Sequence, residues 1–347
     1  MSKRGESAAP GVPPFLLPSS DCLPSMRLAT IDIGTNTAQL LVVEIHNGSV
    51  NRLHAVERFV RLGEGVDEHG RITDAAQDRL LDALRDHRET ARDFGVHQLV
   101  VVGTSALRDA ANRDDVLARA QNELSLTVDI LDGDAEAALS FAAACSAFDD
   151  LAGHCLVVDV GGGSTELIAG TDPSLHAPDY GDAITDRASL DLGCVRLTER
   201  CFSDQPPTDA EIEEADALIE QALQTAALSV GPDPTLIGTA GTATALARVH
   251  AGPDSTWDAL HGDGFTLSHA DVKEWRDRLL RLSTDEIRLL HPDAMEGRAD
   301  VFPVGVMLLD RILDHVGLDT LRVSPYELRH GLALQWHTRN SAPAKVS

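Results

Sequence analysis

One stretch in the middle of the chain constrains the fold most, because an apolar run ends there in an acid and three glycines. It reads Leu156-Val157-Val158-Asp159-Val160-Gly161-Gly162-Gly163-Ser164-Thr165-Glu166. The apolar run predicts a buried strand, and consecutive glycines allow a sharp turn whose N–H groups can bind an anion. An acid at the strand end can hold a cation that bridges to a phosphate. A glycine hairpin with a solvated aspartate explains the same residues, so this stretch alone leaves both interpretations open.

A second stretch near the N-terminus has the same layout. It reads Ala29-Thr30-Ile31-Asp32-Ile33-Gly34-Thr35-Asn36-Thr37-Ala38-Gln39-Leu40-Leu41. Three pairs of residues correspond between the stretches: Asp32 and Asp159, Gly34 and Gly161, Thr37 and Ser164. At a similar distance after each stretch, another apolar run ends in Gly-Thr, at Gly103 and at Gly238. The repetition favours the phosphate-binding interpretation and predicts a duplicated domain.

Length and charge limit the architecture and the partners. A chain of 347 residues suits two domains of ordinary size. A formal net charge of −26 argues against nucleic acid or an anionic membrane as a general partner. Any phosphate site must therefore be local, built from backbone amides, a cation and a few arginines. Lysine is rare and stands at three positions: Lys3, Lys273 and Lys345.

Cysteine and histidine patterns exclude other classes of site. The five cysteines form no C-x-x-C pair, which is typical of reduced thiols in a cytoplasmic protein. The 14 histidines show no H-E-x-x-H spacing, so no zinc site is expected. No apolar run approaches the roughly 18 residues of a membrane span.

We expect a proline-rich disordered leader at 1–25, a first domain at 26–150, a second at 151–337 and a disordered tail at 338–347. Met26 stands directly before the first strand and is a candidate for the native start. A signal peptide is not expected, because the apolar segment of the leader is too short.

Strand and helix patterns alternate in both halves. Besides the two Asp-Gly stretches, the expected strands are 40–45, 50–60, 98–103, 126–131, 189–192, 235–238 and 321–323. The expected helices are 73–94, 104 to beyond 112, 135–148, 301–316 and 326–336, with others starting at 208, 241, 268 and 283. Residues 171–187 are expected to form a polar loop. This alternation predicts α/β layers with mainly parallel sheets and a ligand cleft at the strand ends, between the two domains.

Taken together, the motifs resemble the exopolyphosphatase and guanosine pentaphosphate phosphohydrolase family, which has the actin-like fold related to ribonuclease H. The resemblance covers about residues 27–336. Besides the two Asp-Gly stretches, it rests on Gly103-Thr104-Ser105-Ala106-Leu107-Arg108, Gly133-Asp134-Ala135-Glu136-Ala137, Leu192-Gly193-Cys194-Val195-Arg196, Gly238-Thr239-Ala240-Gly241-Thr242, Gly297-Arg298-Ala299-Asp300 and Leu328-Arg329-His330-Gly331. The expected architecture is two duplicated actin-like domains with a cleft between them.

The resemblance implies hydrolysis of a phosphoanhydride with Mg²⁺ or Mn²⁺. Glu136 would be the general base for the attacking water, and Arg108 would contact the terminal phosphates. Asp159 and Glu166 would hold the metal, and Glu166 would also assist catalysis. The residues implied to bind phosphate are Asp32, Gly34, Thr35, Asn36, Thr37, Thr104, Ser105, Gly161, Gly162, Gly163, Ser164, Gly241 and Thr242. Taken locally, the favoured interpretation of Glu136 is an acid that interacts with a helix dipole.

The chain departs from the family pattern at several positions. Gln39 and Ala138 stand where relatives usually have arginine, which weakens the cationic lining for a long polyphosphate. His330 replaces a glutamate, and Ala135 replaces the acid that often precedes the base. The sequence also ends before the helical C-terminal domains of longer relatives.

The leading hypothesis is an exopolyphosphatase that releases orthophosphate from inorganic polyphosphate. A pppGpp 5′-phosphohydrolase would use the same site, so the substrate is polyphosphate or a phosphorylated guanosine nucleotide. A nucleotide- or polyphosphate-binding regulator with little turnover is a further alternative, whereas the triple-glycine turn disfavours a kinase. From the family, a cytoplasmic homodimer is expected.

Overall fold

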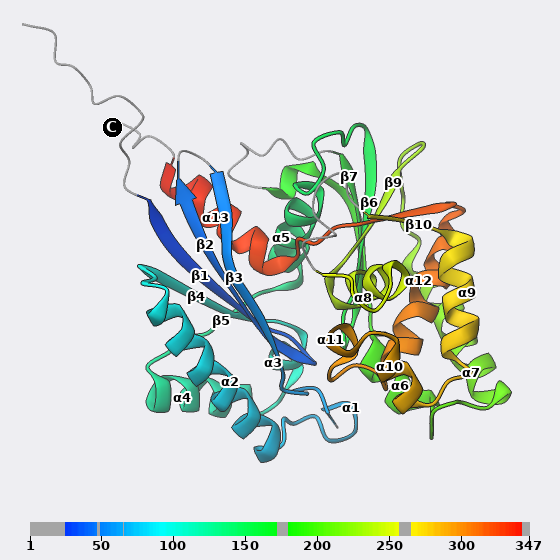
Figure 1. The fold of residues 1–347 in the computed structure, drawn as a ribbon, viewed down its shortest axis with the longest axis horizontal. Helices are drawn as coiled ribbons and strands as arrows, with labels where there is room; N and C mark the ends of the chain where they lie inside the picture. The colour runs from blue at the N-terminus through cyan, green and yellow to red at the C-terminus, as the bar shows by residue number, and fades with distance from the viewer. Residues whose placement is uncertain (1–24, 47–48, 65, 172–179, 257–264, 342–347) are drawn as a thin grey trace, which may run out of the picture.

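The computed structural model describes residues 25–46, 49–64, 66–171, 180–256 and 265–341. Two β-sheets stand side by side, each with helices around it (Figure 1). Most of the predicted leader and the end of the predicted tail lie outside the described residues. Within the described residues, no helix combines the length and the apolar character that a membrane crossing requires.

The first sheet contains five strands in the order β3-β2-β1-β4-β5. Their bounds are β1 Met26–Ile33, β2 Thr37–His46, β3 Ser49–Phe59, β4 Gln98–Gly103 and β5 Asp129–Ile130. The first three strands form an antiparallel meander, and β4 and β5 continue parallel to β1. Both β1 and β4 end at the same edge, which places Asp32 beside the Gly103-Thr104 turn.

The second sheet repeats this arrangement. Its strands are β6 His154–Val160, β7 Thr165–Thr171, β8 Ile184–Leu190, β9 Thr235–Thr239, β10 Phe265–Ser268 and β11 Thr320–Val323. Read from β8, the order β8-β7-β6-β9-β11 has the same directions as the first sheet, and β10 adds one antiparallel strand. This equivalence confirms the predicted duplication.

Helices cover the sheets, and the helices expected to start at 73, 208, 268 and 283 each begin directly after that residue. The helices after the first meander are α1 Val66–His69, α2 Asp74–Asp93, α3 Ser105–Asp109, α4 Arg113–Leu124 and α5 Gly133–Cys145. The remainder are α6 Cys194–Cys201, α7 Asp209–Ala226, α8 Ala240–Ala251, α9 His269–Leu279, α10 Thr284–Leu290, α11 Pro292–Met295, α12 Phe302–Val316 and α13 Leu328–Ser341, with a short 3₁₀ turn at Tyr180–Ala183. At the expected helix starts 208 and 283, Thr208 and Ser283 form capping boxes that satisfy free N–H groups of α7 and α10.

Two helices join the halves of the molecule. Helix α5 packs Ala137 and Phe141 into the core under the second sheet. Helix α13, from the end of the described chain, packs Ala333 against the first sheet and also lies along α5. The two helices can lie this close because residue 331 is a glycine. A Cβ at that position would lie only 2.2 Å from the Leu139 carbonyl oxygen in α5. The domain boundary at residue 150 stays a prediction, since each sheet carries a helix from the other part of the chain.

Several expected elements were wrong. The helix from 104 breaks after α3, because Ala110 is extended and the Asn112 side chain bonds both the N–H and the C=O of Ile72, at 2.9 and 2.8 Å. The expected loop at 171–187 contains the first half of β8, an edge strand with alternating exposure. The sheets are mixed, not mainly parallel, because β2, β3, β7, β8 and β10 run antiparallel to their neighbours.

Candidate active site

The two Asp-Gly turns have the same backbone geometry. In the first, the Gly34 N–H donates to the Thr37 carbonyl oxygen at 2.9 Å, and in the second the Gly161 N–H donates to the Ser164 carbonyl oxygen at 3.0 Å. Each turn joins the first two strands of its sheet and so lies at the strand ends. Because both turns line one cleft, they can hold a phosphate from two sides.

The cleft has a volume of about 120 Å³. Every predicted phosphate-binding residue lines it, together with the predicted base and metal ligands: Asp32, Gly34, Thr35, Asn36, Thr37, Thr104, Ser105, Glu136, Asp159, Gly161, Gly162, Gly163, Ser164, Glu166, Gly241 and Thr242. Arg108 is not in the lining but contacts Glu136. The structure thus brings these residues together, while their roles stay predictions.

The glycines of the second turn allow the two halves to approach closely. A Cβ on Gly163 would lie 2.9 Å from Thr35 Oγ1 and 3.0 Å from Ser105 Oγ. A Cβ on Gly162 would also press on Thr35, at 3.2 Å. Any side chain at these positions would push the turns apart, which gives a physical reason for the triple glycine.

Glu136 lies in the first turn of α5, where Asp132 caps the helix by accepting a hydrogen bond from the Ala135 N–H at 2.8 Å. Arg108, at the end of α3, donates to Glu136 Oε2 at 2.7 Å and to the Leu131 carbonyl oxygen at 3.2 Å. Burial raises the pKa of the Glu136 carboxyl, and the Arg108 ion pair opposes that effect. Glu136 is therefore an oriented carboxylate of increased basicity in the same cleft as the two Asp-Gly turns.

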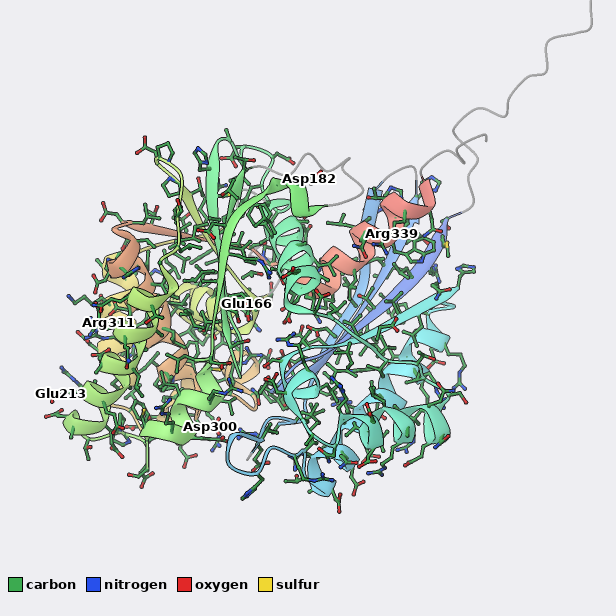
Figure 2. The ribbon with its side chains drawn as sticks, turned by 180° about the vertical axis from the view of Figure 1, so that it is seen from behind. Glu166, Asp182, Glu213, Asp300, Arg311 and Arg339 are labelled. Atoms are coloured by element: carbon green, nitrogen blue, oxygen red, sulfur yellow. The ribbon has the colours of Figure 1, made fainter. Side chains whose placement is uncertain are left out.

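Asp159 and Glu166 face each other as register partners on β6 and β7. Glu166 lies between the two halves of the molecule (Figure 2), and Ser189 Oγ donates to its Oε1 at 3.0 Å. Burial, followed by repulsion from Glu136, raises the pKa of Glu166 to about 7. Burial, followed by repulsion from Glu166, raises the pKa of Asp159 well above its usual range.

This pair fits a hard divalent cation. Two carboxylates directly opposite each other repel, and within the described residues neither has an ion-pair partner. Carboxylate oxygens are the ligands that Mg²⁺ and Mn²⁺ prefer. Such a cation would offset the repulsion between the two carboxylates.

Sequence reasoning missed two neighbouring ion pairs that contribute to the cleft. Gln39 Nε2 donates to Glu57 Oε2 at 3.0 Å, and Arg298 forms an ion pair with Glu57. Glu327 and Arg329 form another, at 2.5 Å. Arg298 and Arg329 both belong to sequence motifs of the family resemblance. Glu57 lies within a strand and belongs to no such motif. Of the four departures from the family pattern, Gln39 alone lines the cleft, while Ala135, Ala138 and His330 do not.

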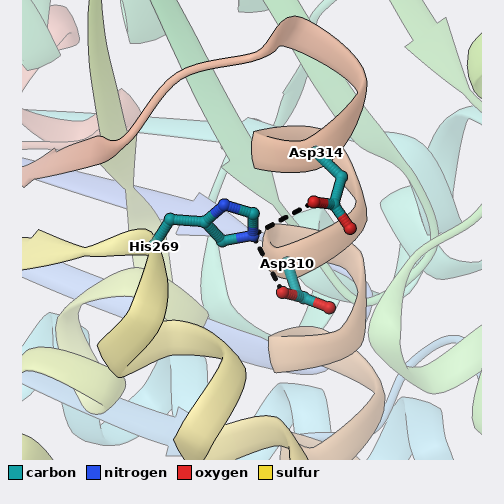
Figure 3. A group of neighbouring side chains, drawn as sticks. All are labelled: His269, Asp310 and Asp314. Carbon is teal, nitrogen blue, oxygen red and sulfur yellow. Dashed lines mark hydrogen bonds and ion pairs between the residues drawn. The ribbon is translucent and has the colours of Figure 1, made fainter.

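A second group of side chains with metal-ligand spacing lies away from the cleft, between α9 and α12 (Figure 3). His269 Nε2 lies 3.0 Å from Asp310 Oδ1 and 3.6 Å from Asp314 Oδ1. Arg276 donates to the other oxygen of Asp310 at 2.6 Å. Because Arg276 already neutralises the buried Asp310, we interpret the group as an ion-pair network that joins the two helices.

The raised pKa values predict a characteristic dependence of stability on pH. Burial, followed by repulsion from Glu136, raises the pKa of Asp32 from 3.8 to about 8. Between these values the folded state holds a proton that the unfolded state has released, so the metal-free protein loses stability as pH rises from about 4 to 8. Asp32→Asn removes this contribution.

Thermal unfolding in a chelator checks this prediction. The melting temperature of Asp32→Asn minus that of wild type should increase by at least about 4 °C between pH 5 and pH 8. A difference that stays constant over this pH range would show that the pKa of Asp32 is not raised.

Comparisons with known proteins agree with the fold and the cleft. The model of the Ppx/GppA phosphatase family matches residues 41–340. Exopolyphosphatase 2 of Mycobacterium tuberculosis is 33% identical over 323 residues, which cover 89% of this chain and 98% of that protein. A guanosine-5′-triphosphate,3′-diphosphate pyrophosphatase of Vibrio atlanticus is 32% identical over 316 residues, which cover 88% of this chain but 58% of that protein.

Among solved structures, the crystal structure of an Aquifex aeolicus member of the same family superposes with a TM-score of 0.75 at 27% identity. The superposition covers 92% of this chain and all of that one. The expected actin-like α/β fold is thereby confirmed. Because the family model matches residues 41–340, which make up most of this chain, the chain belongs to the Ppx/GppA phosphatase family.

Proposed function

We propose that the protein is an exopolyphosphatase that hydrolyses the terminal phosphoanhydride of inorganic polyphosphate and releases orthophosphate. Membership of the family supports phosphoanhydride hydrolysis as the reaction. One observation supports the assignment to this cleft: Glu136, whose carboxylate pairs with Arg108, lines the cleft together with the two Asp-Gly turns. For the substrate, the support comes from the relative matched over 98% of its length, which is named an exopolyphosphatase.

In this proposal the amides and hydroxyls of the two turns hold the terminal phosphate. Glu136 orients a water molecule and accepts its proton as the oxygen attacks phosphorus. The bond from phosphorus to the bridging oxygen breaks, so that the products are orthophosphate and a chain shorter by one phosphate. A Mg²⁺ or Mn²⁺ ion held by Asp159 and Glu166 would neutralise charge on the phosphate oxygens. Arg108 keeps Glu136 ionised and in place, and would contact the terminal phosphate.

A pppGpp 5′-phosphohydrolase is the second candidate. The same cleft would hold the terminal phosphate of a nucleotide, and the Vibrio relative, matched over part of its length, is named for a guanosine polyphosphate. The two substrates differ in the group that carries the terminal phosphate, a phosphate chain or a nucleotide, so only a comparison of substrates separates the two activities.

Orthophosphate release with Mg²⁺ and with Mn²⁺ tests the proposal, using short polyphosphate, long polyphosphate, pppGpp and ATP in parallel. We expect polyphosphate to have the highest kcat/KM, and a chelator to abolish release. A higher kcat/KM for pppGpp would favour the second candidate. No release from any substrate, together with binding of one of them, would favour a regulator with little turnover.

The expected homodimer and cytoplasmic location remain part of the proposal. Sedimentation velocity with the full chain tests the first, since a single monomeric species at micromolar concentration would contradict it.

A further inference from the structure

The charges in the cleft are not balanced by its arginines. Among the described residues, six carboxylates line the cleft, and three of them have an arginine partner: Glu57 pairs with Arg298, Glu136 with Arg108, and Glu327 with Arg329. The other three are Asp32, Asp159 and Glu166, for which the described part of the chain provides no ion pair. One divalent cation would leave this trio with a net negative charge where a polyanion must bind, whereas two would make it positive.

The position for a second cation follows from the duplication. Asp32 on β1 and Gln39 on β2 are register partners, as Asp159 on β6 and Glu166 on β7 are. Cross-strand partners present their side chains on the same face of a sheet, and both Asp32 and Gln39 line the cleft. The first sheet therefore offers a pair of oxygen ligands at the position equivalent to the Asp159–Glu166 pair.

Two oxygen atoms of this pair have no hydrogen-bond partner among the residues that the structure describes. These atoms are Asp32 Oδ1 and Gln39 Oε1, and both are shielded from solvent. Gln39 is only 8% exposed, and its Nε2 donates to Glu57, which fixes which end of the amide is the oxygen. A buried acceptor without a donor is unfavourable because it has lost its hydrogen bonds to water, so a cation or a donor is expected there.

We propose that Asp32 Oδ1 and Gln39 Oε1 bind a second divalent cation, so that the cleft holds two cations, one on each sheet. A carboxylate oxygen and an amide oxygen are hard ligands suited to Mg²⁺ or Mn²⁺, with water or substrate oxygens completing the coordination. Two cations can stabilise the attacking and the leaving oxygens in a displacement at one phosphoryl group. This catalytic role rests on the proposed function, whereas the binding of the cation does not.

Titration of the metal-free full-length protein with Mn²⁺, followed by the electron paramagnetic resonance signal of free Mn²⁺, tests the inference without substrate. We expect two Mn²⁺ per chain in wild type and one in Gln39→Leu, which keeps the size of the side chain but lacks the oxygen. Asp159→Asn should also bind one, because it loses the other site. A single Mn²⁺ in wild type, as expected if water fills the position, would overturn the inference, as would two in Gln39→Leu with unchanged affinity.

A conservative variant covers the case in which Gln39→Leu fails to fold. Gln39→Glu keeps an oxygen at the position and adds a charge. This variant should therefore bind the Mn²⁺ at the Asp32–Gln39 site at least about tenfold more tightly than wild type does. Unchanged affinity in this variant would also overturn the inference. Wild type that binds two Mn²⁺ but releases no orthophosphate would contradict the proposed function alone.

Discussion

Replacing Glu136 with glutamine is expected to slow orthophosphate release by about 10²–10⁴-fold. Glutamine keeps the shape of the side chain and can still contact Arg108, but its amide cannot accept the proton of the attacking water. Because the change falls on the chemical step, kcat should carry most of the loss while KM changes little. Initial rates with polyphosphate and saturating Mg²⁺ measure both.

Asp134 provides the matched control, since it is an acid in the same first turn of α5. Its side chain is 78% exposed and pairs with Arg187 at the surface, away from the cleft lining. Asp134→Asn should therefore stay within about twofold of wild type. Equal losses in the two variants would mean that charge at the helix start, not proton transfer, explains the effect of Glu136.

Replacing Gly331 with alanine is expected to destabilise the protein by about 2–4 kcal/mol. An alanine would normally stabilise a helix relative to glycine by about 1 kcal/mol. Here its Cβ would lie 2.2 Å from the Leu139 carbonyl oxygen, which is backbone and cannot rotate away, so α13 must move off α5. Since α5 also carries Glu136, activity should fall together with stability.

Denaturant unfolding monitored by circular dichroism measures the change in the free energy of unfolding. Gly133→Ala is the matched control, because it lies in α5 and the nearest atom to its added Cβ is 3.9 Å away. We expect this control within about 1 kcal/mol of wild type. A Gly331→Ala variant as stable as the control would show that the α5–α13 contact is loose.

The Asp-Gly turns were predictable because their signal is local. An apolar run, an acid and glycines at fixed spacing determine a strand and a turn, and the repetition of this unit indicated the duplication. The structure adds that the two turns have the same hydrogen bond and line one cleft.

Glu136 shows where local reasoning stops. An acid in the first turn of a helix has the same sequence signature whether it interacts with the helix dipole or orients a water molecule. The contact that distinguishes it, with Arg108, joins residues 28 positions apart and exists only because α3 and α5 pack together. The prediction of Glu136 as a general base therefore came from the family resemblance and not from the periodicity of the sequence.

Tertiary contacts also explain the errors. Asn112 ends the expected long helix through hydrogen bonds to Ile72, 40 residues earlier in the chain. Glu57 belongs to the cleft because Arg298, 241 residues later, reaches it. Neither partner is visible in a window of neighbouring residues.

Hydrolysis of short polyphosphate in H₂¹⁸O tests the central claim most directly, which is that water oriented in this cleft attacks the terminal phosphate. With Mg²⁺, wild type should release orthophosphate that contains one ¹⁸O atom per molecule, and Glu136→Gln should release it at least about 10²-fold more slowly. Orthophosphate without ¹⁸O, or equal rates for the two proteins, would contradict the account.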